Sequence, residues 1–284
     1  MRNSLFVLLV ISLISTTTFS QDFKAPERFT AHNKGKIFFY LGGNGADFTK
    51  SDIRFQGENY DFTLYDVKAK DKPKGMHIDY INPARMTIPQ TNFRIGYFFS
   101  DKYNVSFGVD HMKYVMIQDQ TVNIRGYIDL PDNEPGAVFN GNYDQQPIVL
   151  TDDFLEFEHT DGLNYVNFEV ARFDDISHLF KIGNTDKFQI NVTEGLGLGF
   201  LYPKTNARLL GNERHDDFHV SGYGVSAKLG LNFTFFKYFF IMTELKGGYI
   251  DMQDIRTTQF TVDKAMQSFY FFEREITVGA IFKI

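Results

Sequence analysis

The chain has no cysteine and no tryptophan among its 284 residues. The absence of cysteine excludes disulfide scaffolds, thiolate zinc sites and cysteine nucleophiles. Basic residues are outnumbered, with 29 Lys and Arg against 35 Asp and Glu, so the charge pattern excludes a typical nucleic-acid-binding surface. Beyond the N-terminus no run of 18 apolar residues occurs, which excludes a transmembrane helix. Aromatic residues make up 17% of the chain, far too many for a disordered protein.

The first twenty residues carry the features of a secretory signal peptide. Arg2 precedes an apolar stretch over residues 5–14, and Thr18 and Ser20 are the small residues of a cleavage site before Gln21. Ten apolar residues are too few to cross about 30 Å of hydrocarbon as a helix. We therefore expect an exported protein with a signal peptide at 1–20 and one domain at 21–284. No cysteine follows the apolar stretch, which excludes a lipid-anchored lipoprotein.

Apolar and polar residues alternate along much of the remaining chain, which is typical of β-strands. At the C-terminus, Phe272, Ile276 and Val278 fall on one parity. Glu273 and Glu275 fall on the other parity, together with small residues. The same pattern predicts eight strands, at residues 36–43, 92–99, 105–110, 166–171, 190–200, 223–235, 241–249 and 270–284.

The two faces of these strands differ in a way that indicates a membrane protein. The apolar face is aromatic and nearly free of charge over about ten residues, enough to cover the ~25 Å lipid-facing band of an outer-membrane barrel. The polar face combines Gly, Ser, Thr and Asn with charges of both signs, and suits a narrow lumen. Its charged members are Arg94, Asp110, Glu169, Lys228, Glu244, Lys246, Glu273 and Glu275.

The connections between the predicted strands alternate between short and long. Short joins at 100–103, 174–187 and 236–238 separate long ones at 44–90, 118–161, 202–217 and 251–267. Outer-membrane barrels have short periplasmic turns, long outer loops and an even number of strands. The sequence thus predicts an all-β fold, an eight-stranded antiparallel transmembrane β-barrel with long extracellular loops and both termini in the periplasm.

Two charged residues interrupt the predicted lipid-facing side. Glu194 falls on the apolar parity of its strand, and a β-bulge that turns its side chain away is the expected explanation. Arg274 lies ten residues before Ile284, near the predicted outer boundary, where it could contact lipopolysaccharide phosphate.

With these features, the chain resembles small outer-membrane β-barrels of the OmpA or OmpW kind. More narrowly, it is similar to uncharacterised outer-membrane proteins of the Bacteroidota, and Gln21 at the mature start fits that group. The stretches that carry the resemblance are residues 60–67, 107–115, 157–165 and 268–284. The resemblance covers most of the mature chain and implies a fold and an outer-membrane location, but no catalytic residue.

The charges on the polar face allow two interpretations. Eight strands enclose a lumen just wide enough to be filled by side chains, so the charges are expected to pair with one another and plug it. The alternative is a narrow, cation-selective pore.

A histidine and a serine two residues apart, His219 and Ser221, are the only candidates for catalysis. Two residues apart on a strand they would share a face, as a general base and its nucleophile do, and both fall on the lipid-facing parity near the outer rim. The pair resembles the His-x-Ser of outer-membrane lipid A deacylases and phospholipases, although Gly222 replaces the Asn that usually follows. Asp251, Asp254 or Glu194 could orient the histidine. The alternative is that both residues only mark the end of a strand.

Two loop segments suggest binding. The acidic residues Asp152, Asp153, Glu156, Glu158 and Asp161 could hold Ca²⁺, although a solvated acidic loop is the simpler interpretation. The alternation of Tyr60, Phe62, Leu64 and Tyr65 could extend strands above the membrane, and an exposed apolar edge there would be a partner site. No cofactor is expected.

These features predict a structural or interaction protein of the outer membrane that acts through its extracellular loops. Its expected partners are outer-membrane lipid, lipopolysaccharide and other outer-membrane proteins, with no nucleic acid. One alternative is a lipid A deacylase or phospholipase-like hydrolase. A second is a narrow transporter for small or apolar solutes, and a soluble lipocalin-like binder is a more distant one.

Overall fold

The computed structural model describes residues 32–72 and 90–283. The predicted signal peptide, its cleavage site and Ile284 lie outside these residues. The described residues form fourteen β-strands and two short 3₁₀ helices, η3 (Pro135–Phe139) and η4 (Ser177–Phe180), with no α-helix. No helix within these ranges is long and apolar enough to cross a membrane. The all-β, antiparallel prediction is confirmed.

Eight strands pair in a closed ring. β1 (Lys36–Phe48) is antiparallel to β5 (Thr91–Phe98) on one side and to β14 (Lys264–Lys283) on the other. The ring runs β1-β5-β6-β9-β10-β12-β13-β14, and each of the eight predicted segments overlaps one of these strands. The remaining members are β6 (Tyr103–Met116), β9 (Leu155–Asp175), β10 (Phe188–Leu201), β12 (Gly222–Phe235) and β13 (Phe239–Arg256).

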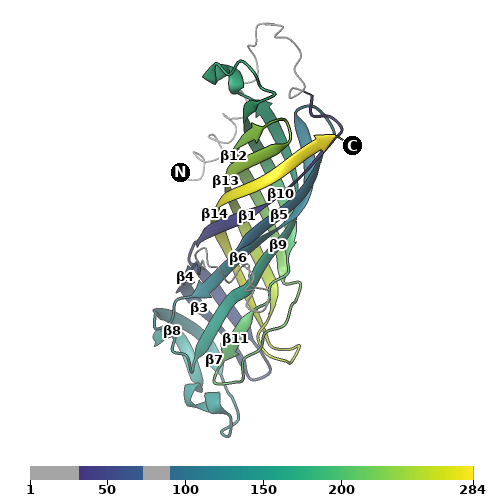
Figure 1. The fold of residues 1–284 in the computed structure, drawn as a ribbon. Coiled ribbons are helices and arrows are strands. Elements are labelled where there is room, and N and C mark those ends of the chain that lie inside the picture. The colour runs from purple at the N-terminus through teal and green to yellow at the C-terminus, as the bar shows by residue number, and fades with distance from the viewer. Residues whose placement is uncertain (1–31, 73–89, 284) are drawn as a thin grey trace, which may run out of the picture.

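The other six strands lie in segments predicted to be loops, so the described chain has more than the eight strands predicted. β14 continues into a sheet in the order β14-β2-β3-β7-β8, while β4 pairs with β6 and β11 pairs with β9. We call these six strands, with the parts of the ring strands that pair with them, the extension. Figure 1 shows the extension at one end of an elongated molecule, with the C-terminal end of β14 at the other. Its strands are β2 (Ser51–Gln56), β3 (Tyr60–Val67), β4 (Ala69–Lys70), β7 (Thr121–Ile128), β8 (Gly141–Val149) and β11 (Asn206–Leu209).

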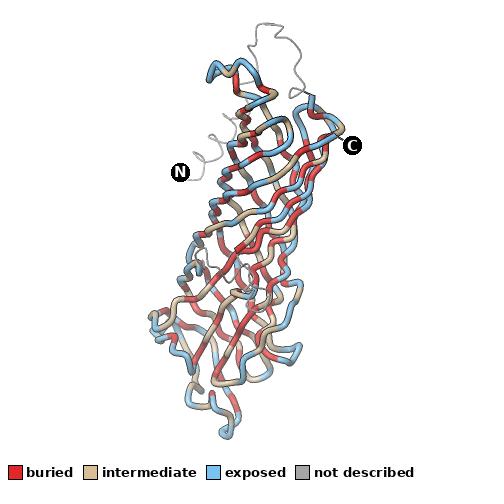
Figure 2. Tube along the Cα trace, in the orientation of Figure 1, coloured by how far each residue is buried: buried red, intermediate tan, exposed pale blue. Residues whose placement is uncertain are grey.

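Along the ring, the apolar face points outward and the polar face inward. On β12, Val225 and Leu229 are exposed while Ser226 and Asn232 are buried. Figure 2 shows this alternation of buried and exposed residues along the ring strands. Glu194 also points outward, opposite Arg172 of β9, and the pairing is regular there. The bulge predicted at Glu194 is therefore wrong, and a basic neighbour accompanies the carboxylate instead.

The interior of the extension is apolar. Its largest cluster of buried hydrophobic residues joins β2, β3, β7 and β11 to the outer parts of β6, β9, β13 and β14. Tyr60, Phe62 and Leu64 belong to this cluster and are at most 4% exposed. The predicted apolar edge is therefore not exposed, because the alternating face of β3 packs against the cluster.

Inside the ring, a second apolar cluster closes the end opposite the extension. Its members are Phe38, Tyr40, Phe98, Phe240, Met242 and Ile281, with Phe173 packed against them. Glycines on the inward face leave room for these rings: a Cβ on Gly96 would overlap the ring of Phe38, and one on Gly279 would overlap Phe240. The interior thus has three layers, apolar, polar and apolar, in order along the ring.

Candidate functional site

The middle layer of the ring holds all eight charged residues predicted to face the lumen. Seven of them are at most 2% exposed, and the side chain of the eighth, Lys228, is 6% exposed; they come from β5, β6, β9, β12, β13 and β14. The alternation of each strand directs its charged side chains inward, and neighbouring strands place them at similar heights. Lys228 lies opposite Lys246, and Glu244 lies opposite Glu275.

Three basic side chains connect most of the carboxylates. The guanidinium of Arg94 lies 3.2 Å from Asp110 and 3.0 Å from Glu169. Lys228 Nζ lies 2.6 Å from Glu169 and 3.0 Å from Glu244. Each basic group therefore bridges two strands or more, and together they tie the ring across its interior.

Lys246 is the most connected of the three. Its Nζ lies 2.7 Å from Asp110, 3.1 Å from Glu169 and 3.0 Å from Glu275. Because β6, β9 and β14 contribute these carboxylates, one ammonium group links four strands of the ring. Buried charges require such pairing, since an unpaired ion in a low-dielectric interior costs several kcal/mol.

Two asparagines complete the layer. Asn92 Nδ2 donates hydrogen bonds to Asp110 (3.0 Å) and Glu273 (3.2 Å). Asn167 Nδ2 donates to Asp110 Oδ2 (2.9 Å), and its Oδ1 accepts a bond from Arg94 (2.9 Å). The search for charged residues missed both, although they lie on the same parity as the charges.

The two apolar clusters enclose this layer along the ring. A small cavity of about 30 Å³ lies between the charges and the Phe38–Phe240 layer, and such a space holds one or two water molecules. On the other side, Phe269, Phe271 and Ile250 begin the core of the extension. The described side chains therefore leave no wide water-filled path through the ring.

His219 and Ser221 do not form the predicted pair on one strand face. Both precede β12, and Ser221 is 2% exposed rather than facing outward. The Ser221 hydroxyl donates to the carbonyl oxygen of His219 (3.4 Å), while the ring Nε2 of His219 lies 2.7 Å from Asp254. The predicted acid Asp254 is thus in place, but the serine hydroxyl is turned to the backbone of His219.

The acidic segment 152–161 does not converge on one point. Asp152 and Asp153 are exposed in a turn, and the segment from Leu155 onward belongs to β9 and is not a loop as predicted. Glu158 pairs with Lys72 at 3.7 Å and Asp161 with Lys204 at 3.7 Å. Among the described residues, no three carboxylates of this segment lie close enough together to hold a metal ion.

Arg274 forms an ion pair on the outer surface of the ring. Its guanidinium lies 2.8 Å from Asp47, and both side chains are more than half exposed. Phe272 and Tyr270, which lie further along β14 towards the extension, are also exposed. Arg274 therefore lies inside the apolar band, with Asp47 as its partner.

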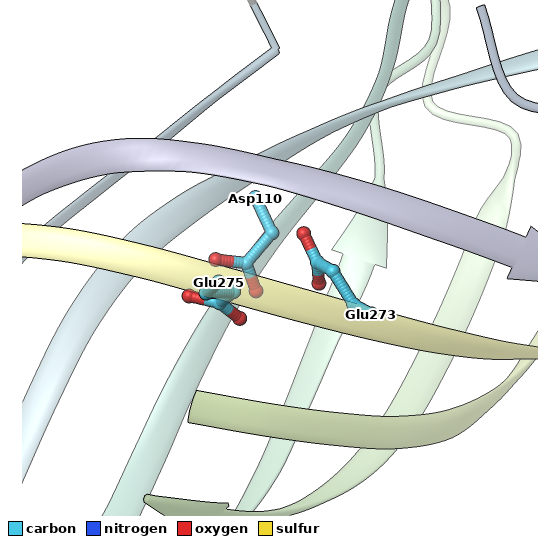
Figure 3. Close-up of side chains that lie close together, drawn as sticks. All are labelled: Asp110, Glu273 and Glu275. Carbon is cyan, nitrogen blue, oxygen red and sulfur yellow. The ribbon is translucent and has the colours of Figure 1, made fainter. Parts of the chain in front are cut away.

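A different group of carboxylates comes together inside the ring. Asp110 of β6 and Glu273 and Glu275 of β14 each place one oxygen within 4.8 Å of the others (Figure 3). The sequence pattern placed them on one face, but it could not show that β6 and β14 approach each other across the lumen.

A second buried polar group lies in the extension. Gln267 Nε2 donates to Tyr114 Oη (2.6 Å) and to Ser51 Oγ (2.8 Å), and His159 Nδ1 lies 2.8 Å from Thr205 Oγ1. Burial lowers the pKa of His159 to about 4, and burial raises the pKa of Tyr114 to about 12. The sequence did not bring these residues together, because Ser51, His159, Thr205 and Gln267 come from segments predicted to be loops.

No family model and no curated protein sequence matches the chain. Among solved structures, it is similar to the outer membrane protein OprG from Pseudomonas aeruginosa, at 10% identity and a TM-score of 0.39, covering 90% of this chain and 100% of that one. Ail, the attachment invasion locus protein of Yersinia pestis, matches at 10% identity and a TM-score of 0.34, covering 88% and 99%. Neisserial surface protein A matches at 10% identity and a TM-score of 0.31, covering 88% and 100%. At these sequence identities and TM-scores the similarity concerns the fold alone and says nothing about ligands.

Proposed function

We propose that the protein is an integral outer-membrane β-barrel that anchors the extension outside the cell as a surface for contacts with partners. In this proposal the chain is exported and cleaved near Gln21, and the ring of eight strands spans the membrane. It belongs with the barrels of the Bacteroidota that its sequence resembles.

The observation that carries the proposal is a change of polarity along single strands. On the outward face of β9, Glu156 and Glu158 are followed by Phe168 and Val170, both more than half exposed. The inward face changes in the opposite sense, from the apolar Phe157 to the charged Glu169. At one end, β9 has a polar outward face and an apolar inward face, as a strand surrounded by water does. At the other end its outward face is apolar and its inward face is charged, as in a strand that faces lipid.

The exposed surface of the extension supports a role in contacts. Val138, Phe260 and Val262 are each at least 59% exposed on it. Phe260 and Val262 line a cleft of about 460 Å³ together with four carboxylates, those of Glu58, Glu134, Glu213 and Asp263. Apolar side chains beside acidic ones favour a partner with both apolar and basic groups.

Expression of the full chain in a Gram-negative host tests the proposal. We expect the protein in the outer-membrane fraction, extractable only with detergent, and protease added to intact cells should cut within the extension. A photo-crosslinking residue in place of Val262 should capture protein or lipopolysaccharide partners, whereas one in place of Leu229 should capture lipid. Recovery of the protein in the soluble periplasmic fraction would contradict the anchoring role.

The layered interior favours this role over a narrow transporter. Any solute would have to pass the apolar cluster, the paired charges and the core of the extension. We expect no conductance above background from the purified barrel in planar bilayers, and steady voltage-dependent channels would favour the transporter instead.

A hydrolase would require Ser221 to leave its buried position and approach the ring of His219. We expect Ser221→Ala to leave the lipid A acyl pattern of the host unchanged relative to the wild-type protein. An acyl chain lost with the wild-type protein and retained with Ser221→Ala would favour the deacylase.

A further inference from the structure

The enclosed polar layer contains more negative than positive side chains. Five carboxylates, of Asp110, Glu169, Glu244, Glu273 and Glu275, face three basic groups, of Arg94, Lys228 and Lys246. If all are ionised, the layer has an excess of two negative charges. An excess of that size cannot remain uncompensated where both neighbouring layers are apolar.

The excess is concentrated on the two carboxylates of β14. Glu273 is fully buried, and among the described residues no basic group lies within 4.0 Å of it. Its Oε1 accepts one bond from Asn92, while its Oε2 has no hydrogen-bond partner. Neither oxygen of Glu275 accepts a hydrogen bond, although Lys246 lies 3.0 Å away.

The three carboxylates lie close enough together to share one divalent cation. One oxygen each from Asp110, Glu273 and Glu275 lies within 4.8 Å of the other two. Figure 3 shows the three side chains grouped beside β14. Calcium binds oxygen at 2.3–2.6 Å, so ligands on opposite sides of the ion are about 5 Å apart. For Mg²⁺ at 2.0–2.1 Å the corresponding separation is about 4 Å, so the spacing admits either ion. Ca²⁺ is favoured because Mg²⁺ gives up its bound water reluctantly, and the apolar layers on both sides leave little room for water.

We propose that Asp110, Glu273 and Glu275 bind one Ca²⁺ ion inside the ring. One divalent cation compensates the excess of two charges and provides a partner for the oxygens of Glu273 and Glu275 that lack one. Two protons on the carboxylates would also neutralise the layer, and the refolding test below distinguishes protons from a bound ion. The proposal does not depend on where the protein is located in the cell.

Because apolar layers close both sides, the ion enters as the barrel folds and exchanges slowly afterwards. The test therefore compares full-length protein refolded into detergent with Ca²⁺, with Mg²⁺ or with EDTA, followed by desalting and elemental analysis. We expect about one Ca²⁺ per chain after refolding with Ca²⁺ and none with EDTA. Thermal unfolding should occur at a higher temperature in the calcium-loaded sample, since a ligand of the folded state stabilises it.

Glu273→Gln provides the matched variant, because it keeps the shape of the side chain and removes its charge. We expect this variant to lose the bound Ca²⁺ and the stabilisation by Ca²⁺. Glu194→Gln, the same substitution on the outer surface, should keep both. Glu275→Gln gives a second variant if Glu273→Gln does not fold.

A wild-type protein that refolds without bound Ca²⁺ and melts at the same temperature with Ca²⁺ and EDTA would overturn the proposal. Retention of one Ca²⁺ by both glutamine variants would also overturn it, by placing the ion elsewhere. Equal stabilisation of wild type by acid alone, without metal, would assign the compensation to protons.

Discussion

At the scale of single residues, the charges inside the ring are the most sensitive part of the molecule. Lys246 contacts carboxylates from β6, β9 and β14 within 3.1 Å and is fully buried. Removing it leaves three carboxylates that have lost a partner and cannot reach water. The interior therefore depends on a few ion pairs far more than an exposed surface does.

We expect Lys246→Met to lower the free energy of unfolding by about 3–5 kcal/mol, because breaking a buried ion pair leaves a charge uncompensated. Denaturant unfolding in lipid vesicles measures this. Lys102→Met is the control, since Lys102 is mostly exposed and pairs with Asp174 at 3.3 Å. That change should cost less than about 1 kcal/mol. Equal effects of the two substitutions would contradict the role assigned to the interior charges.

His159 makes the extension sensitive to acid. Burial lowers its pKa in the folded chain to about 4 from its ordinary value of 6.5, so between these pH values the unfolded chain binds a proton that the folded chain does not. The contribution of the neutral His159 to the free energy of unfolding is complete above pH 6.5 and is lost as the pH falls towards 4. The loss amounts to about 3 kcal/mol.

We expect His159→Phe to reduce the dependence of the free energy of unfolding on pH. The substitution costs about 1 kcal/mol at pH 7 through the lost bond to Thr205, but stability should then fall less between pH 7 and pH 4. Denaturant unfolding at both pH values measures the difference. His178→Gln, at an exposed histidine of η4, should leave the acid dependence unchanged. If His159→Phe loses as much stability between pH 7 and pH 4 as the wild-type protein does, His159 is not the source of the acid sensitivity.

At the scale of strands, the sequence predicts the ring better than the extension. The ring strands carry an apolar face of about ten residues and a charged face, a pattern that indicates lipid on one side and a crowded lumen on the other. In the extension the pattern is that of any water-soluble sheet, and β2, β3 and β7 are short. Nothing local in the sequence specifies that β2 pairs with β14, more than two hundred residues away.

The same limit applies to the site. Parity alone predicts that Asp110, Glu273 and Glu275 face the lumen. Their approach depends on how far neighbouring strands are shifted along one another, which the hairpin connections do not reveal. For Ser221, alternation predicts an outward side chain, but the residue lies before β12, where the strand period does not hold.

The extension is expected to unfold separately from the ring when its own core is weakened. Phe62 of β3 is 1% exposed and packs against Phe55 and Phe154, with ring centroids 5.4 and 5.7 Å away. We expect Phe62→Ala to cost about 3–5 kcal/mol and to admit protease into β2, β3 and β7, while the ring strands stay protected.

Limited proteolysis with mass spectrometry of the fragments measures this opening. Phe260→Ala, at a side chain that is 59% exposed, should leave the cleavage pattern unchanged. Simultaneous loss of protection in ring and extension would indicate that they unfold as one unit.

At the scale of the whole molecule, one antiparallel sheet has opposite distributions of polar and apolar side chains in its two parts. The ring presents Phe, Leu and Val outward and encloses charge, whereas the extension encloses Phe, Leu and Ile and presents polar residues. Both use the same strands, so the ring and the extension are continuous at β6, β9, β13 and β14. In the proposed arrangement, this continuity holds the extension close to the membrane without a flexible linker.

The most direct test of this account is the environment of the outward face of the ring. Because the chain contains no cysteine, single cysteines can be introduced without background. We predict that fluorophores attached at Leu229→Cys and Val278→Cys are strongly quenched by brominated lipid chains. In separate samples without fluorophore, the same cysteines should react slowly with a water-soluble maleimide. A fluorophore at Arg125→Cys, on the outer face of β7, should show the reverse. Rapid maleimide labelling at Leu229 and Val278, with no quenching by lipid, would contradict the account.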